Sequence, residues 1–125
     1  MIHHVSLGTN DVARSRAFYE PVLAVLGLRL IEASEEAAHY GVSSTLFSLT
    51  KPVDGEPASV GNGVHIAFAA GKRAIVDEFH AVALRHGGTD AGAPGLRPEY
   101  NPNYYGAFVR DPDGNKIEAV THHGG

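Results

Sequence analysis

Apolar and polar positions alternate from 4 to 7, within a strand that we expect over residues 2–7. Alternation of this kind is typical of a half-buried β-strand, because neighbouring side chains on a strand point to opposite faces. Val5 and Leu7 are expected on the face that joins the core. His4 and Ser6 are expected on the opposite face, where they are free for other roles.

A change to helical spacing follows this strand. Apolar residues recur at helical intervals between 12 and 26, and Asn10-Asp11 is suited to cap the start of a helix. Gly27 predicts its end, whereas Pro21 lies inside it and predicts either a kink or a split. Three short strands are then expected, at about residues 28–33, 38–42 and 45–50.

The same order of elements begins again after a stretch rich in Pro, Gly, Asp and Ser, which we interpret as a linker over residues 51–63. A strand is predicted at 64–69 and a helix at 74–86, ended by Gly87-Gly88. A short strand, a loop from Ala93 to Asn103 and a closing hairpin complete the chain.

An internal repeat connects the two halves of the chain. An offset of 61 residues gives five identities: His4 with His65, Ala13 with Ala74, Phe18 with Phe79, Leu23 with Leu84 and Gly27 with Gly88. We therefore predict an α+β fold of two βαβββ modules in one domain, residues 1–125. Module one covers residues 1–50 and module two covers residues 64–121.

The C-terminal stretch predicts a β-hairpin whose second strand carries a carboxylate. Apolar runs with β-forming residues flank the turn sequence Asp111-Pro112-Asp113-Gly114. Glu118 lies between Ile117 and Ala119, so it points away from the face that these two residues bury. A carboxylate on the inner side of a curved sheet needs a cation or hydrogen-bond donors to hold it there.

Composition narrows the classes of protein and partner. The 125 residues are 43% hydrophobic and 19% charged, which is ordinary for a globular domain with a core. The net charge of -4, without a run of Lys or Arg, argues against nucleic acid or an anionic membrane as a partner. The absence of cysteine excludes disulfide and thiolate chemistry. Neither a signal-peptide pattern nor an apolar run of about 18 residues occurs, so a cytoplasmic location is expected.

Strand alternation in both modules brings three possible metal ligands to the face opposite the core. His4 and His65 occupy equivalent positions, and Glu118 adds a carboxylate. Small neighbours on this face leave room for a ligand. Two imidazoles and one carboxylate form a three-ligand set for Fe, Mn, Ni, Co or Zn, with coordination positions left open. A single strand histidine is more often packed than a ligand, and no metal role is assigned to His3, His39, His80, His86, His122 or His123.

Taken together, these motifs resemble the vicinal oxygen chelate superfamily, also called the glyoxalase/bleomycin resistance protein/dioxygenase family. The resemblance is carried by residues 2–7, Asp11, Phe18-Tyr19, Gly27-Leu28, residues 64–68 and residues 111–118, and it spans nearly the whole chain. It implies paired modules that form a U-shaped, half-open mixed β-sheet barrel with the helices outside. It also implies that His4, His65 and Glu118 occupy three family metal positions. A homodimer is implied as well, in which a site draws its residues from one chain or from two.

The resemblance does not fix the activity, because this sequence departs from each branch of the family. Ser48 stands where lactoylglutathione lyases have a fourth acidic ligand that also transfers a proton, and a serine supplies neither the charge nor the basicity. Phe108 stands at the tyrosine position of extradiol dioxygenases and of fosfomycin-modifying members, although Ser6 matches a hydroxyl of the latter. Bleomycin-binding members have no catalytic metal, and the intact ligand set does not favour them.

The loop before the closing hairpin is the candidate for a substrate pocket. Arg97 is suited to pair with a carboxylate or phosphate, and the nearby tyrosines are suited to stack on a ligand. The ordinary alternative is a solvated arginine and packed tyrosines. The candidate substrate-binding residues are Ser6, Ser48, Arg97, Tyr100, Tyr104 and Phe108, and no catalytic residue is assigned.

Two functions remain open from the sequence. The first is a divalent-metal-dependent enzyme that acts on a small oxygen-bearing substrate through His4, His65 and Glu118, as a lyase or isomerase, a dioxygenase or a transferase. The alternative is a non-catalytic protein of the bleomycin-resistance type, which binds and sequesters a drug or metabolite. Both predict a small-molecule partner and a homodimer, and neither involves nucleic acid or a membrane.

Overall fold

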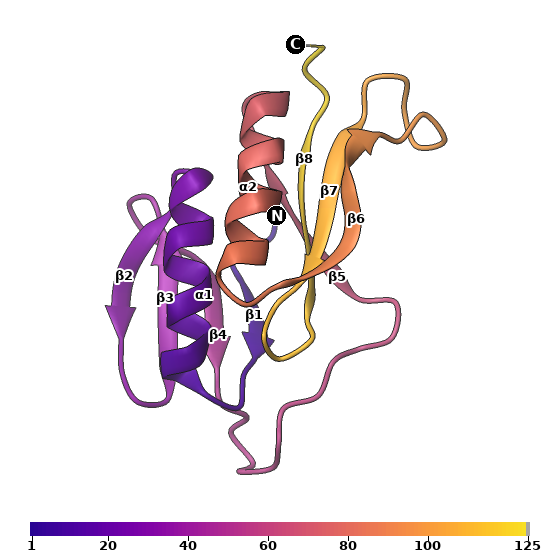
Figure 1. The fold of residues 1–125 in the computed structure, drawn as a ribbon. Coiled ribbons are helices and arrows are strands. Elements are labelled where there is room, and N and C mark those ends of the chain that lie inside the picture. The colour runs from indigo at the N-terminus through magenta and orange to yellow at the C-terminus, as the bar shows by residue number, and fades with distance from the viewer. Residues whose placement is uncertain (125) are drawn as a thin grey trace.

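The computed structural model describes residues 1–124, and Figure 1 shows their helices and strands. The first half contains β1 (Val5–Gly8), α1 (Val12–Val25), β2 (Arg29–Ala33), β3 (Ala37–Gly41) and β4 (Thr45–Thr50). The second half contains β5 (His65–Ala69), α2 (Arg73–Arg85), β6 (Thr89–Leu96), β7 (Tyr105–Arg110) and β8 (Lys116–Thr121). Each half repeats the predicted order βαβββ.

The two halves form separate four-stranded sheets with the same topology. The strand order is β1-β4-β3-β2 in the first sheet and β5-β8-β7-β6 in the second. Only the pairs β1–β4 and β5–β8 are parallel, and the other neighbours are antiparallel. The predicted α+β fold is confirmed, with mixed sheets that do not close into barrels.

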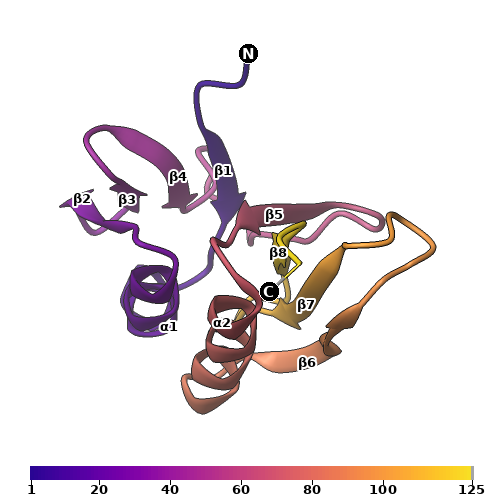
Figure 2. The same cartoon turned by 90° about the horizontal axis from the view of Figure 1, so that it is seen from above.

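Each sheet is covered by a helix on one face only, and the two helices pack against each other. Phe18 of α1, Phe47 of β4 and Phe79 of α2 are buried in a continuous apolar core, and burial of such side chains is the main stabilising term. Val5 and Leu7 pack against this core as predicted. The helix-free faces of the two sheets point in different directions (Figure 2). A single chain therefore presents two open sheet faces.

Both helices are short, with 14 residues in α1 and 13 in α2. A helix needs about 20 apolar residues to cross the hydrocarbon core of a bilayer. Within residues 1–124, no helix is long and apolar enough to do so.

Helix α1 continues through Pro21, which excludes the split that a proline allows. A proline inside a helix removes the hydrogen bond to the carbonyl four residues earlier. That carbonyl belongs to Ala17, which lies on the exposed side of the helix. Water can therefore replace the missing donor there.

Strand β6 is longer than the sequence predicts. It continues to Leu96, although its Pro and Gly content predicts a loop from Ala93 onward. The pairing of β6 with β7 shifts in register near Gly92 and again before Gly95. Since β6 is the edge strand of its sheet, Pro94 is tolerated in this irregular stretch.

The turn between β7 and β8 joins the second half of the chain to the start of α1. One oxygen of Asp113, Oδ2, accepts hydrogen bonds from the hydroxyls of Thr9 at 2.6 Å and Ser15 at 3.0 Å. The other, Oδ1, accepts from the backbone N–H of Asn10 at 2.9 Å. In addition, Asn115 donates from its side-chain amide to a backbone carbonyl of β1 at 2.9 Å. This turn is therefore a structural connection as well as a chain reversal.

A buried pair lies behind this turn. The hydroxyl of Tyr19 donates to Oδ2 of Asp111 at 2.5 Å. Burial raises the pKa of Asp111, although hydrogen bonds from Tyr19 and Asn115 oppose the rise. Burial and the charge of Asp111 raise the pKa of Tyr19 well above its ordinary value, so this phenol remains a donor.

Candidate functional site

Glu118 and His65 meet on the helix-free face of the second sheet. The register of β5 and β8 places Glu118 beside Ala67. Ile117 and Ala119, on either side of Glu118, point into the core. The side chain of Glu118 is fully buried, and its Oε1 lies 3.0 Å from Nε2 of His65. A buried carboxylate is costly unless its oxygens are satisfied, and this contact provides one of the required partners.

Tyr104 provides the second partner of the same carboxylate. Its hydroxyl donates a hydrogen bond to Oε2 of Glu118. Burial, together with Glu118, raises the pKa of Tyr104, so the phenol keeps its proton at neutral pH. Gly106 allows this approach, because a Cβ at that position would lie 2.9 Å from Oε2. Glu118 therefore has a phenol donor although Phe occupies position 108.

A cavity of about 300 Å³ opens beside this pair of side chains. Its lining residues are His65, Tyr100, Tyr104, Phe108, Lys116 and Glu118. The rings of Tyr100 and Tyr104 pack nearly at right angles, with centroids 5.0 Å apart. Three of the predicted substrate-binding residues thus lie in one cavity with His65 and Glu118. Of the others, Arg97 lies close by, with its guanidinium 5.7 Å from the centre of the Phe108 ring.

His4 lies apart from His65 and Glu118. It precedes β1, its surface is exposed, and its Nδ1 lies 2.9 Å from Nδ1 of His3. Within residues 1–124, no three His, Cys, Asp or Glu side chains gather in a way that could hold a metal ion. One chain by itself therefore brings together two of the three predicted ligands.

The register of the first sheet identifies the counterparts of these groups. Ser6 pairs with Ser48 as Ala67 pairs with Glu118, which places Ser48 at the position equivalent to Glu118. His39 pairs with Ser48 from the other side, and its Nδ1 lies 2.7 Å from the Ser48 hydroxyl oxygen. The first sheet therefore carries a hydroxyl–imidazole pair where the second carries a carboxylate.

His39 is a functional candidate that sequence patterns did not indicate. Its neighbours Ala38 and Tyr40 are fully buried on the helix side, so alternation along β3 places His39 on the helix-free face. The alternation around His39 is visible in the sequence, but only the pairing of β3 with β4 shows that His39 lies beside Ser48. An imidazole is the commonest general base in proteins, so this face has a proton acceptor although Ser48 is not one.

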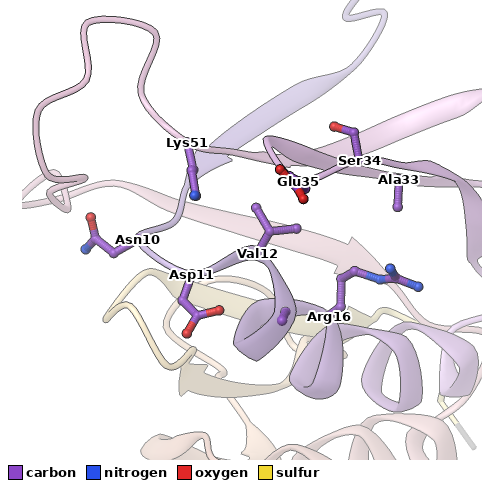
Figure 3. Close-up of a pocket in the computed structure, with 9 residues that line it drawn as sticks. Asn10, Asp11, Val12, Arg16, Ala33, Ser34, Glu35 and Lys51 are labelled. Atoms are coloured by element: carbon purple, nitrogen blue, oxygen red, sulfur yellow. The ribbon is translucent and has the colours of Figure 1, made fainter.

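A second hollow, of about 610 Å³, lies at the start of α1 (Figure 3). Both signs of charge line it, since Asp11 and Glu35 occur there together with Arg16 and Lys51. Asp11 is already used as the cap of α1, where its side chain accepts a hydrogen bond from the backbone N–H of Arg14 at 3.0 Å. No residue lines both this hollow and the cavity beside Glu118. We therefore place the candidate site at the cavity of the second sheet.

Comparison with known proteins agrees with this fold and with the family suggested by the motifs. A family model described as the glyoxalase/bleomycin resistance protein/dioxygenase superfamily matches residues 1–119. The chain therefore belongs to this superfamily. No curated protein sequence matches the chain significantly.

Solved structures show the same architecture over almost the whole chain. A glyoxalase/bleomycin resistance protein from Albidiferax ferrireducens is 39% identical, with a TM-score of 0.88, and the match covers 96% of this chain and 97% of that one. A glyoxalase-related enzyme from Fulvimarina pelagi is 18% identical, with a TM-score of 0.76 and coverage of 96% and 86%. A lactoylglutathione lyase from Agrobacterium tumefaciens is 22% identical, with a TM-score of 0.69 and coverage of 96% and 92%. The last two matches concern the fold alone.

Proposed function

We propose that the protein is a divalent-metal-dependent enzyme that acts on a small oxygen-bearing substrate. The proposal is carried by the fully buried carboxylate of Glu118, which lies against His65 at the wall of a cavity. The side chain of His65 is 40% exposed, so the imidazole of this pair is open to the cavity, whereas Glu118 lies buried behind it. A carboxylate and an imidazole fit a divalent cation when a third ligand completes the set.

We assign the third ligand to His4 of a second copy of the chain. Ser48 and His39 belong to the helix-free side of the first sheet, and alternation before β1 assigns His4 to the same side. His65 and Glu118 belong to the helix-free side of the second sheet. These two open faces point in different directions within one chain (Figure 2). A two-fold dimer that places the first sheet of one copy against the second sheet of the other would form two identical sites.

Side chains of both open sheet faces have definable tasks in this proposal. When bound, the cation would act as a Lewis acid that polarises an oxygen of the substrate. Tyr104 holds Oε2 of Glu118 by donating its proton. His39, hydrogen-bonded to Ser48 on the open face of the first sheet, is suited to accept a proton. Phe108 gives the cavity an apolar wall, which limits the access of water.

The proposal predicts that untagged protein from metal-supplemented cells contains bound divalent metal. It also predicts turnover within a panel of small oxygen-bearing compounds that is lost on chelation and restored by the metal. His65→Ala should abolish both properties, because it removes one ligand. The matched control is His80→Ala, since His80 lies on α2 and contacts Asp90 at 2.9 Å.

Mass spectrometry of the protein and assays before and after chelation make this test. Wild-type protein without metal after reconstitution would contradict the proposal, as would turnover that chelation leaves unchanged. In the first case, the sequestering function becomes the better account of the cavity.

A further inference from the structure

Two cationic side chains flank one aromatic ring at the wall of the candidate site. The ammonium of Lys116 lies 4.9 Å from the centre of the Phe108 ring, and the guanidinium of Arg97 lies 5.7 Å from it. Phe108 and Lys116 line the cavity beside His65 and Glu118. Positive charge is therefore concentrated where a ligand would sit.

Neither cation is neutralised within the part of the chain that the structure describes. Among residues 1–124, no ion pair involves Arg97 or Lys116. Of the described residues that line the cavity, Glu118 alone is acidic, and its two oxygens are occupied by His65 and Tyr104. The cavity thus offers positive charge without a matching free carboxylate, which favours an anionic ligand.

Arg97 is held in place before any ligand arrives. Its Nη1 donates to the carbonyl of Gly95 at 2.9 Å, and its Nη2 donates to the carbonyl of Ala93 at 2.7 Å. Two glycines leave space for this side chain, because a Cβ at Gly92 or Gly95 would lie 3.3 or 3.2 Å from the guanidinium nitrogens. Such fixing reduces the entropy that ligand binding must overcome.

The remaining walls favour a flat ligand. Tyr100, Tyr104, Phe108 and the imidazole of His65 surround the cavity, and the Phe108 and His65 rings lie 5.7 Å apart. The volume of about 300 Å³ is at the lower end of small-molecule sites. Aromatic walls stack on planar groups, whereas cations near the cavity pair with an anionic end.

The geometry points to a small planar organic acid as the substrate class of this site, with its carboxylate at the positive charge of Lys116 and Arg97 and its plane against the rings of Tyr100 and Tyr104. This inference rests on the proposed function in taking the cavity for the substrate site. It does not depend on the metal, because the two cations and the aromatic walls belong to one chain.

Benzoate and its uncharged analogue benzamide are suitable probes, because they have nearly the same shape. Ligand-observed NMR titration of chelator-treated protein measures their affinities in the absence of metal. We expect wild-type protein to bind benzoate at least about tenfold more tightly than benzamide. Lys116→Met or Arg97→Met should weaken benzoate about tenfold and leave benzamide unchanged, since methionine keeps the aliphatic part of the side chain.

The matched control is Lys51→Met, which removes the same charge from the hollow at the start of α1. Equal affinities for benzoate and benzamide in the wild type would overturn the inference, and so would an equal loss in Lys51→Met and Lys116→Met. A lower affinity of Lys116→Met for both benzoate and benzamide would also overturn the inference, because that pattern indicates altered packing. Metal content is measured on separate untreated samples. Protein that lacks metal but prefers benzoate would refute the metal site and support this inference. Protein that binds metal but does not prefer benzoate would support the metal site and overturn this inference.

Discussion

Glu118→Gln should lower the affinity of the protein for divalent metal by at least about 100-fold while the chain remains folded. The substitution removes the only charged ligand of the proposed site but keeps its shape. The amide still offers one oxygen and one nitrogen to Tyr104 and His65, which now contact the two carboxylate oxygens. The buried side chain is thus not left unsatisfied, so the main loss should be in metal binding.

Equilibrium dialysis followed by mass spectrometry measures this affinity, and urea unfolding confirms that the variant is folded. Glu99→Gln is the matched control, because Glu99 is exposed in the loop between β6 and β7 and does not line the cavity. Metal binding by Glu118→Gln at the wild-type level would show that this carboxylate is a structural group held by Tyr104 and His65. The metal would then lie elsewhere.

Asp113→Ala should lower the free energy of unfolding by about 3 kcal/mol. The carboxylate accepts hydrogen bonds from Thr9, Ser15 and the backbone of Asn10, and Arg14 approaches it at 2.5 Å. Its removal leaves two hydroxyls and a backbone N–H without their acceptor in a largely buried place. It also separates the β7–β8 turn from the start of α1, so both halves of the fold lose a contact.

The same carboxylate predicts a pH dependence. Burial alone would raise the pKa of Asp113, but hydrogen bonds from Thr9, Asn10 and Ser15 and the charge of Arg14 hold it below the ordinary value of 3.8. The folded state therefore binds this proton less well than the unfolded state does. The resulting stability is present above about pH 4 and is lost as the pH falls through the lower folded value.

Urea unfolding at pH 7 and pH 3 measures both effects. The difference between wild type and Asp113→Ala should be smaller at pH 3, while the raised pKa of Asp111 acts in the opposite direction in both proteins. Asp54→Ala is the control, because Asp54 is an exposed linker residue. A loss below about 1 kcal/mol at pH 7, or one equal to that of Asp54→Ala, would contradict the structural role of the turn.

The regular elements were predictable because their hydrophobic periods are strong. Alternation at Val5 and Leu7 and the spacing around Phe18 and Phe79 predicted the strands and helices whose residues form the core. The repeat predicted that both halves share one topology, and the matching strand orders of the two sheets confirm this. Elements with weak patterns were less predictable, as in the edge strand that contains Pro94.

The arrangement of the site was only partly predictable. Alternation along a strand tells which face a side chain occupies, but it does not tell how two sheets are oriented. The separation of His4 from the pair His65–Glu118 therefore required the structure. The contact of Tyr104 with Glu118 was also hidden, because Tyr104 lies in a loop without periodicity. Asp113 looked like a turn residue, and its long-range partner Thr9 is 104 residues away in sequence.

We propose that one metal site is built from His4 of one copy and from His65 and Glu118 of another. Two variants that should bind no metal alone, His4→Ala and Glu118→Ala, test this shared site when they are mixed under conditions that exchange subunits. Random pairing gives one intact site in each mixed dimer, so the mixture should recover about a quarter of the wild-type metal content. Mixing His65→Ala with Glu118→Ala is the control, because both changes affect the same half-site and no intact site can form. Recovery only in the first mixture is the result predicted here, and no metal in either mixture would contradict a site shared between two copies.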